Sequence, residues 1–146
     1  MYNKYFEILI NEAEKNTLDI PVCAMIVKNN EILSIANNKR EENNSVIAHA
    51  EILAIWEANK KLNSRRLDGC DMYVTLEPCP MCAWAIINSG VKNLYFGSYN
   101  TQYGAFGSAI NLAKLANSKI NVYGGIYEER CKELLDSYFK GLRNEK

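Results

Sequence analysis

Apolar and polar residues follow one another along the chain with spacings that change from segment to segment. Residues 2–15 place apolar side chains every three or four positions, which predicts an amphipathic helix. Residues 22–27 and 32–36 are apolar runs that predict two strands. The Asn29-Asn30 pair between them suits a tight turn, so the two strands should form a hairpin. Residues 37–47 are mainly polar and predict a loop.

The rest of the chain alternates between helical and strand patterns. Helices are predicted at residues 48–63, at 78–89 with Pro78 opening the first turn, at 109–115 and at 127–142. Strands are predicted at residues 72–76, 93–96 and 120–123, with a loop rich in Gly, Ser and Tyr at 97–108. The apolar side of helix 48–63 is predicted to consist of Ile52, Leu53, Ile55 and Trp56. This order favours an α/β fold with helices on both faces of a sheet and parallel pairing among the later strands.

The composition restricts the class of protein. The 146 residues suit one domain, expected to span 1–146, and 48% of them are hydrophobic, which is enough for a core. Lys+Arg and Asp+Glu both number 17, so a nucleic-acid partner would have to be bound by a local patch or a shaped pocket. The charged N-terminal segment argues against a secretory signal, and no apolar run approaches the roughly 18 residues of a membrane span. The five cysteines favour a reduced, cytoplasmic setting with a metal or redox site over a disulfide framework.

Two of the cysteines form a C-x-x-C pair. Cys79 and Cys82 are three residues apart in the first turn of a predicted helix, so both side chains share one face. The free N–H groups and the dipole of a helix start lower thiol pKa values and favour the thiolates that zinc binds. On spacing alone, a redox pair or two unrelated core cysteines explain the pattern equally well.

The single histidine of the chain changes that balance. His49 also lies in the first turn of a predicted helix, and one His with two Cys supplies the three protein ligands of a catalytic zinc site. The fourth position of such a site stays open for water. A closed structural site would need a further ligand from Cys23, Cys70 or Cys131, each of which stands alone in its segment.

Glu51 completes a recognisable constellation. It follows His49 by two residues, and one carboxylate can take a proton from water and then protonate a leaving amine. Alone, Glu51 would be an ordinary solvated side chain. Together, the His49-Ala50-Glu51 and Pro78-Cys79-Pro80-Met81-Cys82 segments match H-x-E…P-C-x-x-C, a signature of zinc-dependent nucleobase deaminases. In that chemistry zinc makes water a nucleophile at neutral pH, a base loses its exocyclic amine, and ammonia leaves.

These motifs make the chain similar to the cytidine deaminase-like superfamily and, within it, to the bacterial tRNA-specific adenosine deaminases that convert wobble adenosine to inosine. The resemblance covers nearly the whole chain. It runs through Ile20-Pro21-Val22, Asn38, Ala48-His49-Ala50-Glu51-Ile52, Tyr73-Val74-Thr75-Leu76-Glu77-Pro78-Cys79, Gly104-Ala105-Phe106-Gly107-Ser108, Cys131, Leu134-Leu135 and Tyr138-Phe139-Lys140.

The resemblance implies a three-layer αβα sandwich with a five-stranded mixed sheet, one Zn²⁺ per subunit, a homodimer and a tRNA anticodon loop as partner. It implies that Asn38 hydrogen-bonds the target base, in a pocket lined by Val22, Ala50 and Leu76; without the resemblance, Asn38 would be explained equally well as a turn residue. Contacts with the RNA are expected from the loop before the glycines and from the last helix. The candidates are Tyr99, Asn100, Tyr138, Phe139, Lys140 and Arg143.

Three departures from the family pattern concern the substrate more than the chemistry. Tyr99-Asn100-Thr101-Gln102 stands where the tRNA enzymes usually carry Arg-Asp-x-Lys, so two cations that could meet phosphates are absent. Trp84 replaces a small residue, and Cys23 replaces a glycine.

Two alternatives to an RNA substrate therefore stay open. The first is a deaminase of a free base or nucleoside such as guanine or cytosine, because guanine deaminases share the Glu-Pro-Cys-Pro-Met-Cys string and zero net charge suits a small ligand. The second is a non-catalytic, zinc-stabilised binding module whose metal is closed by Cys23 or Cys70.

Overall fold

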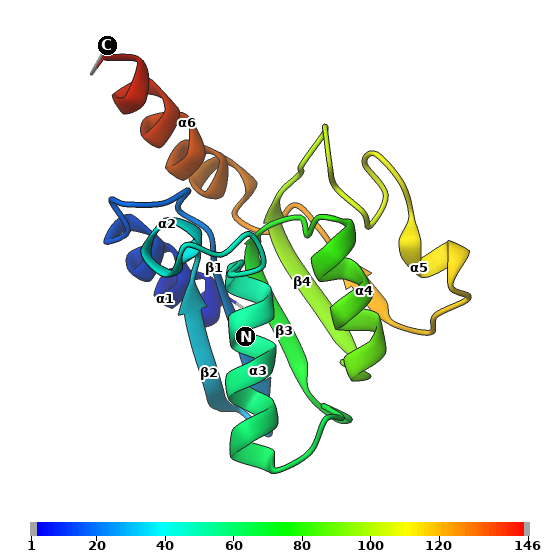
Figure 1. Ribbon diagram of the computed structural model, residues 1–146. Helices are drawn as coiled ribbons and strands as arrows, with labels where there is room; N and C mark the ends of the chain where they lie inside the picture. Colours follow the sequence, from blue (N-terminus) through cyan, green and yellow to red (C-terminus); the bar gives the residue numbers. More distant parts are fainter. Residues whose placement is uncertain (1–2, 145–146) are drawn as a thin grey trace.

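The computed structural model describes residues 3–144, with side chains described through residue 142. A five-stranded mixed sheet in the order β2-β1-β3-β4-β5 forms its centre (Figure 1). The strands are β1 (Cys23–Lys28), β2 (Glu31–Asn37), β3 (Asp71–Leu76), β4 (Asn93–Ser98) and β5 (Asn121–Tyr123). β1 pairs antiparallel with β2 and β3, whereas β3, β4 and β5 run parallel, as the alternation of helices and strands predicts.

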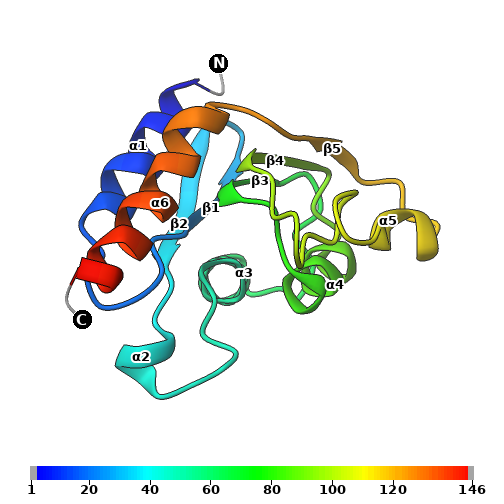
Figure 2. The same ribbon diagram turned by 90° about the horizontal axis from the view of Figure 1, so that it is seen from above.

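Helices cover both faces of this sheet. They are α1 (Asn3–Glu14), α2 (Arg40–Asn43), α3 (Ala50–Leu62), α4 (Pro80–Ser89), α5 (Leu112–Leu115) and α6 (Glu128–Asn144). Seen from above, α1 and α6 lie together on one face, and α3 and α4 lie side by side on the other, with α5 beyond α4 (Figure 2). Each face encloses its own cluster of buried apolar side chains. The three-layer αβα sandwich is confirmed.

The predicted hairpin is confirmed at the turn itself. Asn29 and Asn30 are the two loop residues between β1 and β2, with φ of 51° and 65°. Two successive positive φ values belong to the type I′ turn, whose twist matches that of the flanking strands. Asparagine tolerates this left-handed conformation better than other residues with a side chain.

The buried face of α3 differs from the predicted one. Ala50, Ala54 and Ala58 are fully buried against the sheet, and the Ser34 hydroxyl donates to the Ala54 carbonyl at 2.7 Å. Trp56 is 59% exposed, and Ile52, Leu53 and Ile55 are only partly buried. The prediction was wrong because it followed the largest apolar side chains, whereas alanines let the helix backbone approach the strands closely.

Several boundaries also differ. α2 lies within residues 37–47, which were predicted to be a loop, and α5 begins three residues later than expected. α4 begins at Pro80, so Pro80 and not Pro78 occupies the first turn. Residue 2, at the start of the first predicted helix, lies outside the described residues. Among residues 3–144, no helix combines the length and apolar character that crossing a membrane requires.

Candidate active site

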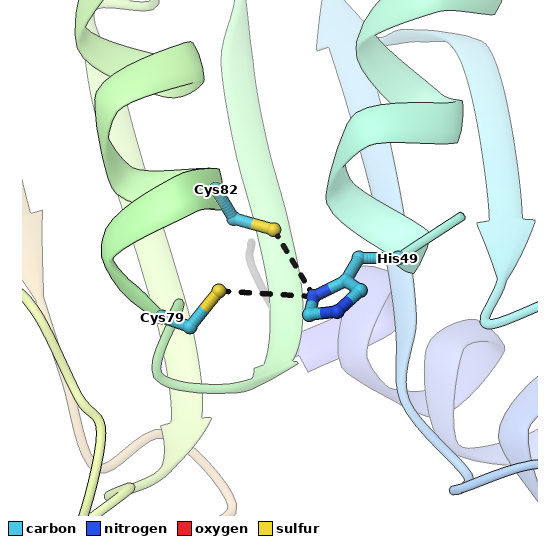
Figure 3. A group of neighbouring side chains, drawn as sticks. All are labelled: His49, Cys79 and Cys82. Carbon is cyan, nitrogen blue, oxygen red and sulfur yellow. Dashed lines mark hydrogen bonds between the residues drawn. The ribbon is translucent and has the colours of Figure 1, made fainter. Parts of the chain in front are cut away.

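Three potential metal ligands meet at the starts of two neighbouring helices. His49 is the N-cap of α3, Cys79 is the N-cap of α4, and Cys82 lies in the first turn of α4 (Figure 3). The Nδ1 atom of His49 is 3.4 Å from the Cys82 sulfur and 3.7 Å from the Cys79 sulfur. A tetrahedral zinc ion with Zn–S of about 2.3 Å and Zn–N of about 2.0 Å separates its ligand atoms by roughly 3.5–3.8 Å. Both distances from His49 therefore match a zinc site, and all three ligand atoms lie within 4.8 Å of one another.

The helix starts explain why these side chains are free to converge. His49 and Cys79 both have extended backbone conformations, and neither side chain makes a capping hydrogen bond. The prediction that both lie inside a first helical turn was wrong by one position. The consequence for the chemistry is small, because an N-cap side chain still faces the free N–H groups and the positive end of the helix dipole.

The thiols of Cys79 and Cys82 are coupled by a hydrogen bond that moves their pKa values in opposite directions. A hydrogen bond from Cys82 lowers the pKa of the Cys79 thiol to about 4. The same hydrogen bond, together with burial, raises the pKa of Cys82. Since zinc binds thiolates, an ion bound here would displace the remaining proton from the pair. Within residues 3–144, no other group of His, Cys, Asp and Glu side chains has the spacing of a metal site, and Cys23 and Cys70 lie outside this one.

Glu51 lies beside the ligands without belonging to their group. Its side chain is 4% exposed, and its carboxyl lies within hydrogen-bonding reach of the Cys82 sulfur. Burial raises the pKa of the carboxyl to about 7, and the negative charge on Cys79 adds to this effect. A carboxyl that titrates near neutral pH can both accept and donate a proton during one reaction cycle.

Comparison with known proteins agrees with this geometry. Residues 1–98 match the family model described as the cytidine and deoxycytidylate deaminase zinc-binding region. The chain belongs to this zinc-binding deaminase family. The matched region ends at the last residue of β4 and includes every residue of the metal cluster as well as Glu51.

The similarity to individual deaminases extends beyond that region. The tRNA-specific adenosine deaminase of Bacillus subtilis is 41% identical over 97% of this chain and 91% of its own. A solved structure from studies of A-to-I editing by tRNA:A34 deaminases superposes with a TM-score of 0.83 at 33% identity, covering 90% of this chain and 99% of the other. The guanine deaminase of Bacillus subtilis superposes less completely, with a TM-score of 0.66 at 32% identity over 69% of this chain and 67% of its own.

The predicted pocket residues of this deaminase are joined by hydrogen bonds. Asn38 Oδ1 accepts from the N–H of Ala50 at 2.8 Å, and the Asn38 N–H donates to the Val22 carbonyl at 3.1 Å. Asn38 therefore caps α3 from a distant segment and leaves the His49 ring free for the metal. Leu76 ends β3, close to the metal-binding turn. Their roles towards a substrate stay a prediction.

The predicted RNA contacts lie on two separate elements. Tyr99 is 45% exposed at the start of the loop after β4, and Asn100 follows it with partial exposure. On α6, Phe139 and Lys140 are exposed, while Tyr138 lines a cavity of about 460 Å³ between α1 and α6. The Arg143 side chain lies outside the described part of the chain.

One buried acid near the site was not among the predicted site residues. Glu77 is 1% exposed and accepts hydrogen bonds from the loop of residues 99–108. The Glu-Pro-Cys string marks its position, but only the folded loop reveals which donors surround it.

Proposed function

We propose that this protein hydrolyses adenosine to inosine at the wobble position of tRNA, with one zinc ion per subunit. The observation that carries the proposal is the extent of its similarity to tRNA-specific adenosine deaminases, which continues past residue 98 to nearly the whole chain. The match to a tRNA:A34 deaminase structure covers 99% of that protein, whereas the guanine deaminase is matched over 67% of its length.

The residues of the site suit each step of this hydrolysis. His49, Cys79 and Cys82 would hold the ion, which when bound makes water nucleophilic near neutral pH. Glu51 takes a proton from the attacking water and later delivers it to the leaving amine. A C–O bond forms at the carbon bearing the amine, the C–N bond breaks, and ammonia leaves.

The substrate pocket would be formed by the residues around the start of α3. Asn38 keeps one amide hydrogen and one oxygen lone pair beyond the bonds to Ala50 and Ile20, which suits the edge of a base. Val22, Ala50 and Leu76 would supply apolar walls. Phe139 and Lys140, which are exposed on α6, would face the RNA, and a tRNA substrate would place the enzyme in the cytoplasm.

Arg40 is a cation near the metal ligand His49, with which its charge interacts. The N–H of the preceding Lys39 donates to the Ala48 carbonyl at 2.9 Å, which places Arg40 beside the segment leading into His49. Among residues 3–142, Arg40 forms no ion pair, and its buried Nε has no hydrogen-bond partner. A guanidinium that has no ion pair among these residues can bind phosphate oxygens through its terminal amino groups.

Arg40→Ala should therefore weaken binding of an anticodon stem-loop about tenfold at moderate salt. The slope of log affinity against log salt concentration should become shallower by about one, as expected for the loss of one phosphate contact. Fluorescence anisotropy over a range of salt concentrations measures both quantities. Lys119→Gln is the control, because this exposed lysine precedes β5 at the end of the sheet away from the site. Equal affinity and slope in wild type and Arg40→Ala would exclude the phosphate contact.

The surface of α3 and α4 supports a homodimer. Trp56 and Trp84 are 59% and 51% exposed on the side of these helices that faces away from the sheet, and Met81 lies on the same layer. Exposed tryptophans on adjacent helices are typical of an interface core.

Trp84→Glu should raise the dimer dissociation constant at least about thirtyfold. Light scattering over a concentration series tests this, with Leu18→Glu on another surface as control; a wild-type monomer, or an unchanged dimer in Trp84→Glu, would reject this interface.

A second candidate is a deaminase of a free base. It is favoured by the similarity to guanine deaminase and by the zero net charge. The comparison of kcat/KM for an anticodon stem-loop with that for guanine, cytosine and adenosine separates the two. Preference for the stem-loop supports the proposed function, and preference for any free base rejects it.

A further inference from the structure

The loop of residues 99–108 is attached to the segment that carries the metal ligands. The N–H of Ala105 donates to the carbonyl of Pro78 at 2.9 Å, one residue before Cys79. The N–H of Glu77 donates to the carbonyl of Ser98 at 2.8 Å, just before the loop begins. These two hydrogen bonds hold the loop beside the metal-binding segment.

The carboxylate of Glu77 is surrounded by donors from this loop. It accepts the backbone N–H of Asn100 at 3.2 Å, those of Phe106 and Ser108 at 3.1 Å each, and the Ser108 hydroxyl. Among residues 3–142, no Lys or Arg forms an ion pair with it. A buried carboxylate without an ion pair is costly unless several hydrogen bonds satisfy its oxygens, so these four donors tie the loop to Glu77.

A glycine makes this arrangement possible. A Cβ atom at Gly104 would lie 2.4 Å from both Glu77 Cδ and the Asn100 carbonyl oxygen, which is too close for any side chain. The N–H of Gly104 donates to that same carbonyl at 2.7 Å. The loop thus folds tightly around the carboxylate.

The held loop presents aromatic surface to solvent. The Tyr99 ring packs edge-on against Phe96, with 5.2 Å between ring centroids, and still leaves 45% of the side chain exposed. Tyr103 is 60% exposed, and its N–H donates to Asn100 Oδ1 at 3.1 Å. A fixed, half-exposed tyrosine beside a base-modifying site suits stacking on an unpaired RNA base.

We propose that Glu77 is a positioning residue that holds loop 99–108 beside the metal site, so that Tyr99 stacks on an RNA base next to the target adenosine. The inference rests on the proposed function for its substrate. Glu77 itself contacts neither the substrate nor the reacting atoms; it acts through the loop.

Kinetics with an anticodon stem-loop test the role towards RNA. Glu77→Gln removes the charge and places amide hydrogens against N–H donors, so KM should rise at least about tenfold. The kcat should fall less than about threefold and zinc content should stay at the wild-type level, because the metal ligands and Glu51 are intact. Ser108→Ala removes a single donor, leaves the Glu77 carboxylate and its three backbone donors in place, and should raise KM by a smaller factor. Glu31→Gln is the charge control, because Glu31 lies beside the turn between β1 and β2, at the end of the sheet away from the metal site.

Amide hydrogen exchange tests the positioning without relying on activity. The amides of Asn100, Phe106 and Ser108 should exchange at least about tenfold faster in Glu77→Gln, while those of α3 and α4 stay unchanged. Unchanged exchange, faster exchange with unchanged KM, or a parallel loss of zinc and kcat would each overturn the inference. Absence of inosine with wild type would instead reject the proposed function, and the exchange result would still decide whether Glu77 holds the loop.

Discussion

Glu51→Gln should lower kcat for deamination by about 10²–10⁴-fold, the range that removal of a general acid–base commonly costs. Glutamine keeps the size of the side chain but can neither take the proton from water nor return it to the leaving amine. Because Glu51 lies outside the group of metal ligands, zinc content should not change. Substrate affinity should also stay within a few fold.

Single-turnover kinetics with saturating enzyme measure this effect, with zinc determined on the same samples. Glu57→Gln is the matched control, since Glu57 is an exposed acid on the same helix and pairs with Lys60 at the surface. If Glu51→Gln retained more than a tenth of the wild-type kcat, Glu51 would not be the group that moves the protons.

Cys82→Ser should remove both the zinc and the activity. Serine is a much poorer zinc ligand than a thiolate, and the two remaining side chains do not complete a catalytic set of three. We expect less than a tenth of the wild-type zinc per chain and a loss of activity of about 10³-fold or more, because a catalytic metal supplies several kcal/mol to the transition state. Because zinc binds the native state and not the unfolded chain, its loss should also lower the melting temperature.

Cys70→Ser is the control for this prediction, because Cys70 is equally buried but lies outside the metal cluster. Zinc per chain, activity and melting temperature are measured in parallel, with chelator-treated wild type as the reference for metal loss. Cys82→Ser with full zinc would contradict the assigned ligand set. Loss of zinc in Cys70→Ser would point to a different one.

The fold could be predicted from the sequence because local signals and tertiary contacts agree. The Asn29-Asn30 pair gives the hairpin, and helices between β3, β4 and β5 require the parallel pairing that the sheet has. The metal cluster could also be predicted, because its members lie in two short motifs whose spacings are set by the backbone. In both cases the deciding information is local.

The features that could not be predicted depend on contacts between distant segments. Asn38 caps α3 across twelve positions of sequence, a role that the sequence analysis did not assign. Trp56 is exposed because alanines occupy the side of α3 that packs on the sheet. The spacing of apolar residues alone does not show which side of the helix is buried. Glu77 is stabilised by donors more than twenty positions away, so its burial could not be inferred from the residues beside it.

Deamination of a wobble adenosine in RNA is the reaction proposed for this site. The most direct test incubates the zinc-loaded protein with an anticodon stem-loop carrying one wobble adenosine and measures inosine by mass spectrometry of the digested nucleosides. Glu51→Ala and a stem-loop with the adenosine moved one position serve as controls. We predict inosine only for wild-type protein with the wobble adenosine. No inosine from protein that holds zinc, or equal conversion of the displaced adenosine, would contradict wobble-specific deamination.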